Sequence, residues 1–353
     1  MKHRSWMMVA TLTVAAIIAG DTQADVFTMP TGQTSLDFVT VGDAGNGADT
    51  STGSLYGSVP YVYQMGKYDV TVGQYCEFLN AVAKTDTYGL YNYRMGLGVF
   101  FPTVGIAQSG SSGNYSYSIV GNYSQGANCP IFAVNWGSAA RFCNWLQNGQ
   151  PAFPVGTPGE VASSTETGAY TLNGDTHSFL ETRNPGATYF IPSENEWYKA
   201  AYYKGGSTNA GYWAYPTQSD DAPGNVFSSS GTNNANYYNN GYSDATNYLT
   251  PVGAFSASPG PYGTFDMGGD VFQWNEAVVS PYRGLRGGSY SPFLNSSCLA
   301  SSPPSASCER PWGEYDDVGF RVASVPEPAS FAMLLAGIIS LLGYAWQRRE
   351  RAT

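Results

Sequence analysis

The stretches that decide the fold are YGTFDMGGDVFQW at residues 262–274 and RGGSY at residues 286–290. In the second stretch two adjacent glycines can adopt backbone angles that other residues avoid. Such a turn can bring the side chains on either side of it to the floor of a cleft. A tight turn in a β-rich core would use the same glycines, and the residues alone leave both interpretations open. The candidate cleft residues are Arg286, Gly287, Gly288 and Ser289.

Five further blocks occur in order around these two. They are GKYDVTVGQY at 66–75, PIFAVNW at 130–136, YFIPSENEW at 189–197, TPVG at 250–253 and GFR at 319–321. Together the seven blocks resemble the formylglycine-generating enzyme family, also called the sulfatase-modifying factor domain. The resemblance runs from about residue 35 to residue 323 and rests on the order of the blocks. It implies a single α+β domain with little regular secondary structure, related to C-type lectins.

Three segments have the pattern of helices. The predicted helices run from Val72 to Ala83, from Ser138 to Leu146 and from Glu194 to Tyr203. In the first two, apolar side chains recur at intervals of three and four residues. The third begins with a capping box, in which Ser193 and Glu196 satisfy backbone N–H groups at the helix start.

The segments between the helices differ in composition. Residues 85–130 and 150–188 are rich in Gly, Ser, Tyr and Thr, which predicts long surface excursions or a hairpin. Three tryptophans stand beside apolar residues at helix or strand edges, so we expect them in the core rather than at a ligand. They are Trp136, Trp197 and Trp274.

Two positions after the RGGSY block bear on catalysis. The resemblance implies that oxidases of this family hold one Cu(I) between two cysteines, two and seven residues past the aromatic of that block. Those positions are Pro292 and Ser297 here, and Cys298 is one residue out of register. A second branch of the family uses iron held by several histidines of an extra helical domain. His177 is the only histidine beyond the first 24 residues. We therefore expect no copper, haem or iron.

The resemblance implies calcium at two sets of residues. At the first, side-chain oxygens of Asp266 and Gln273 would join backbone carbonyls of Gly269 and Val271, a donor set that suits a hard cation. Gln273 stands where the family usually has Glu, and Asp270 where it usually has Asn. The second set comprises Asn236, Tyr237 through its backbone and Asp244. Turn capping is the alternative role for these acids and amides.

The five cysteines permit two disulfides and one leftover thiol. Cys76 and Cys143 lie on the apolar faces of two predicted helices that this fold would bring together. Cys298 and Cys308 close a short loop, which leaves Cys129 as the spare. Packed thiols at Cys76 and Cys143 would look the same from sequence, and four cysteines allow three connectivities.

The charge of the chain excludes one class of partner. Residues 25–325 hold 23 acids against 11 bases. Such an acidic body repels phosphate backbones, so we expect no nucleic-acid partner. Loops rich in Asp and Asn favour divalent cations over anions.

The first 24 residues are typical of a secretory signal. A basic start precedes an apolar run from Met7 to Ala19, and small residues stand at the predicted cleavage site. Signal peptidase is therefore an expected partner. The mature chain would begin at Asp25, and the domain would span residues 25–323.

The last segment, residues 324–353, combines three features in order. Pro326-Glu327-Pro328 precedes an uncharged apolar run over residues 329–346, and a cluster of arginines follows. The run is long enough to cross a bilayer as a transmembrane helix, with the arginines on the cytoplasmic side. Together these features resemble the PEP-CTERM sorting tag, and an ordinary tail anchor is the alternative. The resemblance implies removal by an exosortase, usually in bacteria that make exopolysaccharide.

Two functions follow from these expectations. The first is an exported, non-catalytic and calcium-stabilised module of the cell envelope or extracellular matrix, held transiently in the inner membrane by its C-terminal helix. Its Tyr- and Asn-rich loops would bind carbohydrate or an envelope protein. The second is an oxidoreductase of the family with altered active-site chemistry near Ser289.

Overall fold

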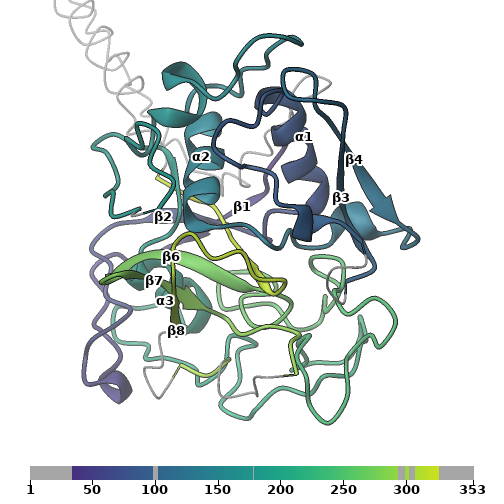
Figure 1. The fold of residues 1–353 in the computed structure, drawn as a ribbon. Helices are drawn as coiled ribbons and strands as arrows, with labels where there is room; N and C mark the ends of the chain where they lie inside the picture. The colour runs from purple at the N-terminus through teal and green to yellow at the C-terminus, as the bar shows by residue number, and fades with distance from the viewer. Residues whose placement is uncertain (1–33, 98–101, 178, 293–298, 302–306, 326–353) are drawn as a thin grey trace, which may run out of the picture.

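The computed structural model describes residues 34–97, 102–177, 179–292, 299–301 and 307–325. The helices are α1 (Val72–Val82), α2 (Trp136–Gln147) and α3 (Glu194–Tyr202), with short turns η1 (Thr50–Thr52), η2 (Tyr93–Met95), η3 (Gly126–Asn128) and η4 (Ala162–Glu166). The strands are β1 (Phe38–Val41), β2 (Tyr63–Gly66), β3 (Val104–Ser109), β4 (Ser116–Gly121), β5 (Tyr189–Phe190), β6 (Phe272–Val279), β7 (Tyr282–Arg286), β8 (Ser307–Glu309), β9 (Val318–Gly319) and β10 (Ala323–Ser324). Short elements joined by long loops make an α+β domain with little regular secondary structure, as predicted (Figure 1).

The described residues form two four-stranded sheets and a separate two-stranded one, β3–β4. The first has the order β1-β2-β10-β5, so a strand from the end of the domain lies between β2 and β5, which come much earlier in the chain. The second has the order β8-β7-β6-β9, in which β9 runs parallel to β6 and the other pairs are antiparallel. Figure 1 shows α1 and α2 beside each other above the sheets, with the long loops of residues 205–265 below. The 262–274 block runs into β6 and the 286–290 block begins at the end of β7, so this strand pair positions the candidate site.

The three predicted helices are confirmed within one or two residues. The capping box at Ser193 and Glu196 is present, and Thr71 and Gln74 form another at the start of α1. The second helix begins two residues earlier than predicted. Its N-cap is Asn135, whose side chain accepts a hydrogen bond from the Ser138 N–H at 2.8 Å. The polar cap rather than the apolar periodicity sets where this helix starts.

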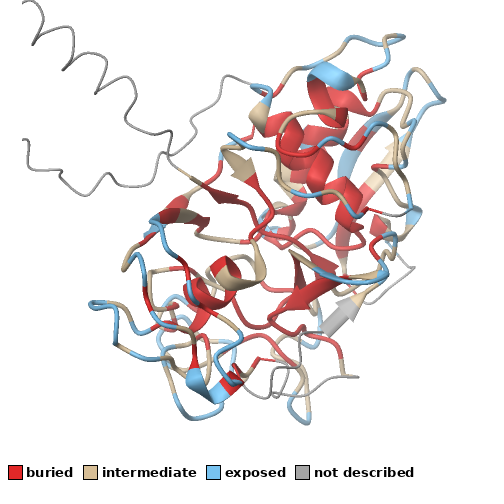
Figure 2. Cartoon of the chain, turned by 90° about the vertical axis from the view of Figure 1, so that its left-hand side faces the viewer, coloured by how far each residue is buried: buried red, intermediate tan, exposed pale blue. Residues whose placement is uncertain are grey.

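The core between α1 and α2 is aromatic. The Phe142 ring lies 5.3 Å from that of Phe78 and 6.2 Å from that of Tyr75. Edge-to-face and stacked rings at these distances add to the stability from burial alone. Figure 2 shows buried residues concentrated on the helices and sheets, with exposed residues on the loops.

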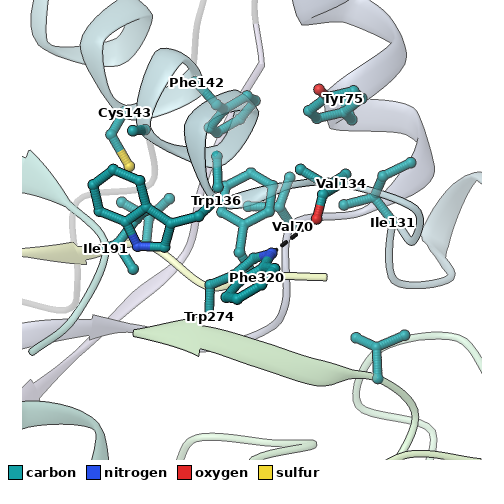
Figure 3. Packing of buried hydrophobic residues seen from close by; sticks show 14 of the residues in the cluster. Val70, Tyr75, Ile131, Val134, Trp136, Phe142, Cys143, Ile191, Trp274 and Phe320 are labelled. Atoms are coloured by element: carbon teal, nitrogen blue, oxygen red, sulfur yellow. Dashed lines mark hydrogen bonds between the residues drawn. The ribbon is translucent and has the colours of Figure 1, made fainter. Parts of the chain in front are cut away.

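The three tryptophans are buried, as predicted, and each indole N–H has a partner. Trp136 donates to the Asn275 carbonyl at 3.1 Å, and Trp274 donates to the Val134 carbonyl at 2.8 Å. Figure 3 shows the second of these bonds between β6 and the segment before α2. Burying an indole without a partner for its N–H would cost stability, so these bonds fix how the helix layer sits on the second sheet.

The segments between the helices only partly follow the prediction. The expected hairpin within residues 85–130 is present as the antiparallel pair β3–β4. Residues 150–188 contain exposed loops, but part of this segment is buried against α2. There Arg141 makes two hydrogen bonds, of 2.7 and 3.0 Å, with Glu166 of η4. A buried ion pair, which sequence composition does not reveal, ties this segment to the core.

The predicted disulfide between Cys76 and Cys143 is wrong, because both residues are free thiols. The two side chains have different neighbours. The Cys76 sulfur lies 3.7 Å from the Asn80 amide nitrogen, which donates to the Tyr117 carbonyl of β4. Cys143 instead lies near Trp136 and Ile191 (Figure 3). Aromatic rings rather than a disulfide fill the space between α1 and α2.

The remaining cysteine predictions have different outcomes. Cys129, the predicted spare, is also a buried free thiol. Cys298 lies outside the described residues, and only the backbone of Cys308 is described, so the pairing of these two stays a prediction.

Both predicted end segments, residues 1–24 and 329–346, lie outside the described residues. Within the described ranges, no helix has the length and apolar character needed to cross a bilayer.

Candidate functional site

The RGGSY turn needs both of its glycines. Gly287 has φ +100° and Gly288 has φ +71°, in the left-handed region that favours glycine. The Gly287 carbonyl accepts a hydrogen bond from the Gly269 N–H at 2.9 Å. A Cβ atom at Gly287 would lie 2.9 Å from the Met267 carbonyl oxygen. The turn therefore packs directly on the loop of residues 266–270, which we call the DMGGD loop.

The two ends of the turn have different surroundings. Arg286 is buried, and its Nε donates to the Glu194 carboxylate of α3 at 2.6 Å. Its guanidinium also lies over the rings of Tyr56 and Tyr198, at 4.8 and 5.3 Å. Arg286 thus anchors β7 to α3. The Ser289 end contacts a different set of polar groups.

Two adjacent carboxylates meet the Ser289 end of the turn. The Ser289 hydroxyl donates to Asp317 at 2.8 Å, and the Tyr290 hydroxyl lies 3.2 Å from an Asp316 carboxylate oxygen. Burial raises the pKa of Asp317 to about 6, although the Ser289 hydroxyl favours its charged form. Sequence reasoning missed both acids. Their position before the GFR block, separated from it by one residue, is the signal that could have found them.

A row of tyrosines continues from Tyr290, and we call it the tyrosine ladder. Its members are Tyr238, Tyr242, Tyr248 and Tyr290. Successive ring centroids along it are 5.0, 4.8 and 6.2 Å apart. The first three rings are partly exposed, whereas Tyr290 is buried. Sequence reasoning noted Tyr-rich loops but not this row, whose signal is the run YYNNGY at residues 237–242.

The side chain of Gln273 lies under the DMGGD loop. Its carbonyl oxygen accepts from the Trp197 indole N–H at 2.7 Å and from Arg321 Nε at 3.2 Å. Its amide nitrogen donates to the Asp266 carbonyl at 2.7 Å. All of these groups belong to the seven sequence blocks. Three of the seven blocks therefore meet in space around one buried amide.

Comparison with known families agrees with this arrangement. The family described as "Sulfatase-modifying factor enzyme 1-like domain" matches residues 26–325. The chain belongs to this family. A second match, to the PEP-CTERM protein-sorting motif, covers residues 324–349. That motif indicates an exported, membrane-processed protein and implies processing by an exosortase.

Solved structures resemble the chain over most of its length at low sequence identity. They include CarF (21% identity, TM-score 0.46, 83% of this chain and 99% of that one). Treponema denticola variable protein 1 has 19% identity and a TM-score of 0.47, over 84% of this chain and 98% of that one. PvdO from Pseudomonas aeruginosa has 17% identity and a TM-score of 0.43, over 84% and 96%. No curated protein is similar enough in sequence to count as a match.

The copper positions of this sulfatase-modifying factor domain are only partly described. Pro292 directly follows the RGGSY turn and Ser291, whereas Ser297 lies outside the described residues. The thiols of Cys76, Cys129 and Cys143 are buried. Burial raises the pKa of Cys76 to about 11 and that of the other two further. A protonated thiol is a poor ligand for a metal ion.

The first predicted calcium set of the domain does not fit the ion as the side chains stand. Gln273 points an N–H, not an oxygen, at the Asp266 carbonyl. An Asp266 carboxylate oxygen accepts from the Gly253 N–H at 2.6 Å. Burial raises the pKa of Asp266 to about 6, which the Gly253 N–H and the Arg321 charge oppose. Two of the four predicted ligands, Asp266 and Gln273, are thus in contact, but through a hydrogen bond that closes the loop.

Asp270, which stands where the family usually has Asn, joins the two predicted calcium sets. Its carboxylate accepts from the Asn236 amide at 2.7 Å and from the N–H and hydroxyl of Thr250 at 2.8 and 2.7 Å. Burial and the nearby Asp266 raise its pKa to about 8, and these donors oppose the shift. Asn236 therefore donates to Asp270 instead of lying free to bind a cation.

The rest of the second set shows turn capping. An oxygen of Asp244 accepts from the N–H groups of Thr246 and Asn247, at 2.8 and 2.9 Å, and its other oxygen accepts from the Asn247 amide at 2.7 Å. The Tyr237 carbonyl accepts from the Asn225 amide at 3.2 Å. Within the described ranges, no group of three or more His, Cys, Asp or Glu residues is arranged to hold a metal ion. Calcium at this set stays a prediction.

Proposed function

We propose that this exported protein is a non-catalytic binding module of the cell envelope or exopolysaccharide matrix, and that it binds carbohydrate along the tyrosine ladder. The single observation that carries the proposal is the continuous row of rings from Tyr238 to Tyr290. The row ends at the Ser289–Asp317 pair, beside the turn that is central to this family.

The chemistry of the ladder suits a sugar. A partly exposed tyrosine offers an apolar ring face to the C–H groups of a pyranose and a hydroxyl to its polar edge. Asn239 and Asn240 lie exposed in the same loop, and an amide can both donate to and accept from sugar hydroxyls. The net charge of −10 repels acidic polymers. We therefore propose a neutral polysaccharide rather than one rich in uronic acids.

The thiol chemistry supports a non-catalytic role. Pro292 cannot supply the sulfur that the first copper position needs, and Ser297 offers only a hydroxyl at the second. The described cysteines are buried thiols on or before α1 and α2, with their pKa values raised by burial. The proposal therefore assigns no redox chemistry to the RGGSY turn.

A glycan array with the full chain, purified in a mild detergent, tests the binding proposal. We expect neutral glycans to be retained, and Tyr242→Ala to weaken the best of them at least about tenfold, as the loss of a central aromatic contact does. Tyr93→Ala is the matched control, because Tyr93 is 64% exposed and outside the ladder. A blank array, or equal loss in both variants, would remove the carbohydrate proposal and leave an envelope protein as the ligand to seek.

An aerobic assay separates this proposal from an oxidoreductase with altered chemistry. The chain is incubated with Cu(I) and a cysteine-containing sulfatase peptide, and the peptide mass is followed. We expect no formylglycine. Turnover above a buffer control would show that the domain is an enzyme, and loss of that turnover in Ser289→Ala would place it at the RGGSY turn.

A further inference from the structure

The orientation of the Gln273 amide is set by its neighbours. The Trp197 indole N–H and Arg321 Nε can only donate, and a backbone carbonyl can only accept. Since the first two contact one end of the amide at 2.7 and 3.2 Å, that end is the oxygen. The other end, 2.7 Å from the Asp266 carbonyl, is therefore the NH₂ group. The reverse orientation would oppose donor to donor and acceptor to acceptor.

This orientation leaves no place for an ion between the Gln273 amide and the backbone carbonyl of Asp266, and an Asp266 carboxylate oxygen already accepts from the Gly253 N–H. Calcium takes oxygen ligands at about 2.3–2.6 Å, and it lies between them. Here the Gln273 amide nitrogen and the Asp266 backbone carbonyl oxygen are already 2.7 Å apart, with a hydrogen between them. The amide also cannot supply the negative charge that a glutamate would bring to the same position. The Gln273 N–H thus joins residue 273 to Asp266 by a direct hydrogen bond, where a bound cation would join them by coordinating both.

Arg321 supplies positive charge to the same cluster. Its guanidinium donates to the carbonyls of Gly66 and Phe265, each at 2.7 Å, and lies 3.4 Å from an Asp69 carboxylate oxygen. Arg321 and Asp69 are both buried. A buried cation of the chain therefore already faces the acids beneath the DMGGD loop, and Asp270 has three donors of its own.

We propose that Gln273, held by Trp197 and Arg321, replaces a bound cation in this domain, so that the DMGGD loop is closed by an amide hydrogen bond and needs no metal. The consequence is a scaffold that keeps the tyrosine ladder in place when calcium is scarce. The proposal concerns the first calcium set alone and does not depend on what the ladder binds.

Thermal unfolding of the full chain in detergent, with about 1 mM calcium or with a chelator, tests this. We expect any calcium-dependent shift in the wild-type Tm to disappear in Asp244→Asn, which removes the second calcium set. Gln273→Glu places a carboxylate against the Asp266 carbonyl, so we expect its Tm to fall in chelator and to recover by about 2–4 °C or more with calcium. Gln125→Glu adds the same charge on the surface, because Gln125 is exposed, and is expected to behave as the wild type. A Gln273→Glu variant that folds but ignores calcium would overturn the proposal.

Equilibrium dialysis with calcium gives a second readout that does not need the glutamate variant to fold. The second calcium set is removed by Asp244→Asn, and we expect this variant to bind no calcium. Binding by the wild type that disappears in Asp244→Asn would place the ion at the second set and agree with the proposal. A calcium ion retained by Asp244→Asn would contradict it. Neither measurement uses a glycan, so its outcome is separate from that of the binding proposal.

Discussion

Individual residues in this domain are held by hydrogen bonds that link the family blocks. Gln273 is the clearest case, since it joins α3, the DMGGD loop and the GFR block through three contacts. Ser289 and Asp317 form a second such link, between the RGGSY turn and the segment before β9. Both links are buried or nearly so, and their loss should therefore be measurable in stability as well as in function.

Gly287→Ala should destabilise the domain by about 1–3 kcal/mol, because the added Cβ meets the Met267 carbonyl at 2.9 Å and the residue is held at φ +100°. Chemical denaturation followed by tryptophan fluorescence measures the change. Gly149→Ala is the control, since Gly149 has φ +78° but nothing within 4 Å of its Cβ position. Equal losses would show that the close approach to Met267 carries no energy.

Asp317 should make the domain less stable as the pH rises. Its pKa is about 6 in the folded state and 3.8 for a free side chain, so the folded state binds the proton more tightly. The stabilisation is complete below the unfolded pKa and is lost as the pH rises through about 6. The free energy of unfolding should differ between pH 4 and pH 8, and we expect Asp317→Asn to reduce this difference by about 1–2 kcal/mol. Urea titrations at the two pH values measure it, and an unchanged difference would assign the dependence to other groups.

The helices depend on caps and on one aromatic interface. α3 starts at a capping box whose Glu196 also accepts two hydrogen bonds from Arg183, at 3.0 and 2.7 Å. α1 and α2 pack against each other through aromatic rings and not through a disulfide. The elements are short, and isolated helices of this length are marginal in water. Their stability therefore comes from their caps and from packing.

Ser193→Ala should lower stability by about 1 kcal/mol, because it removes the hydroxyl that accepts from the Glu196 N–H. The free energy of unfolding in urea measures the loss. Ser116→Ala, at an exposed position of β4, serves as the control and should have little effect. A loss at Ser193 no larger than at Ser116 would mean that packing alone holds the start of α3.

Cys76 and Cys143 should both react with iodoacetamide in denaturant without prior reduction. Both are free thiols, Cys76 beside Asn80 of α1 and Cys143 beside Trp136 and Ile191 (Figure 3). Peptide mass mapping of the unreduced, exported protein detects either the labelled peptides or a cross-linked pair. Recovery of a peptide joining Cys76 to Cys143 would contradict the packing of these helices.

At the scale of the whole molecule, the domain brings the functional segments together from distant parts of the chain. β10, near the end of the domain, pairs with β2 and β5, and β9 pairs with β6. These pairings carry the segment of residues 307–325 past the RGGSY turn, which places Asp316 and Asp317 beside it. The sorting motif at residues 324–349 follows directly. We expect the tyrosine ladder to remain accessible when the tag is removed, since it belongs to another part of the domain.

Sequence by itself determined the family, the three helices, the buried tryptophans and the glycine turn. The helices follow from apolar periodicity and polar caps, which are local patterns. The turn follows from two adjacent glycines, which can adopt the positive φ angles found there. The order of the seven blocks predicted the fold, because all seven in order are specific to the family, whereas any single block is not.

Only the tertiary structure decided which side chains meet. Cys76 and Cys143 were expected to pair because both lie on apolar helix faces, but sequence does not say how two helices are rotated against each other. Gln273 looked like a weakened calcium ligand until Trp197 and Arg321 fixed which end of its amide faces Asp266. The direction of a hydrogen bond and the orientation of a side chain depend on groups far apart in the chain. No local sequence pattern predicts them.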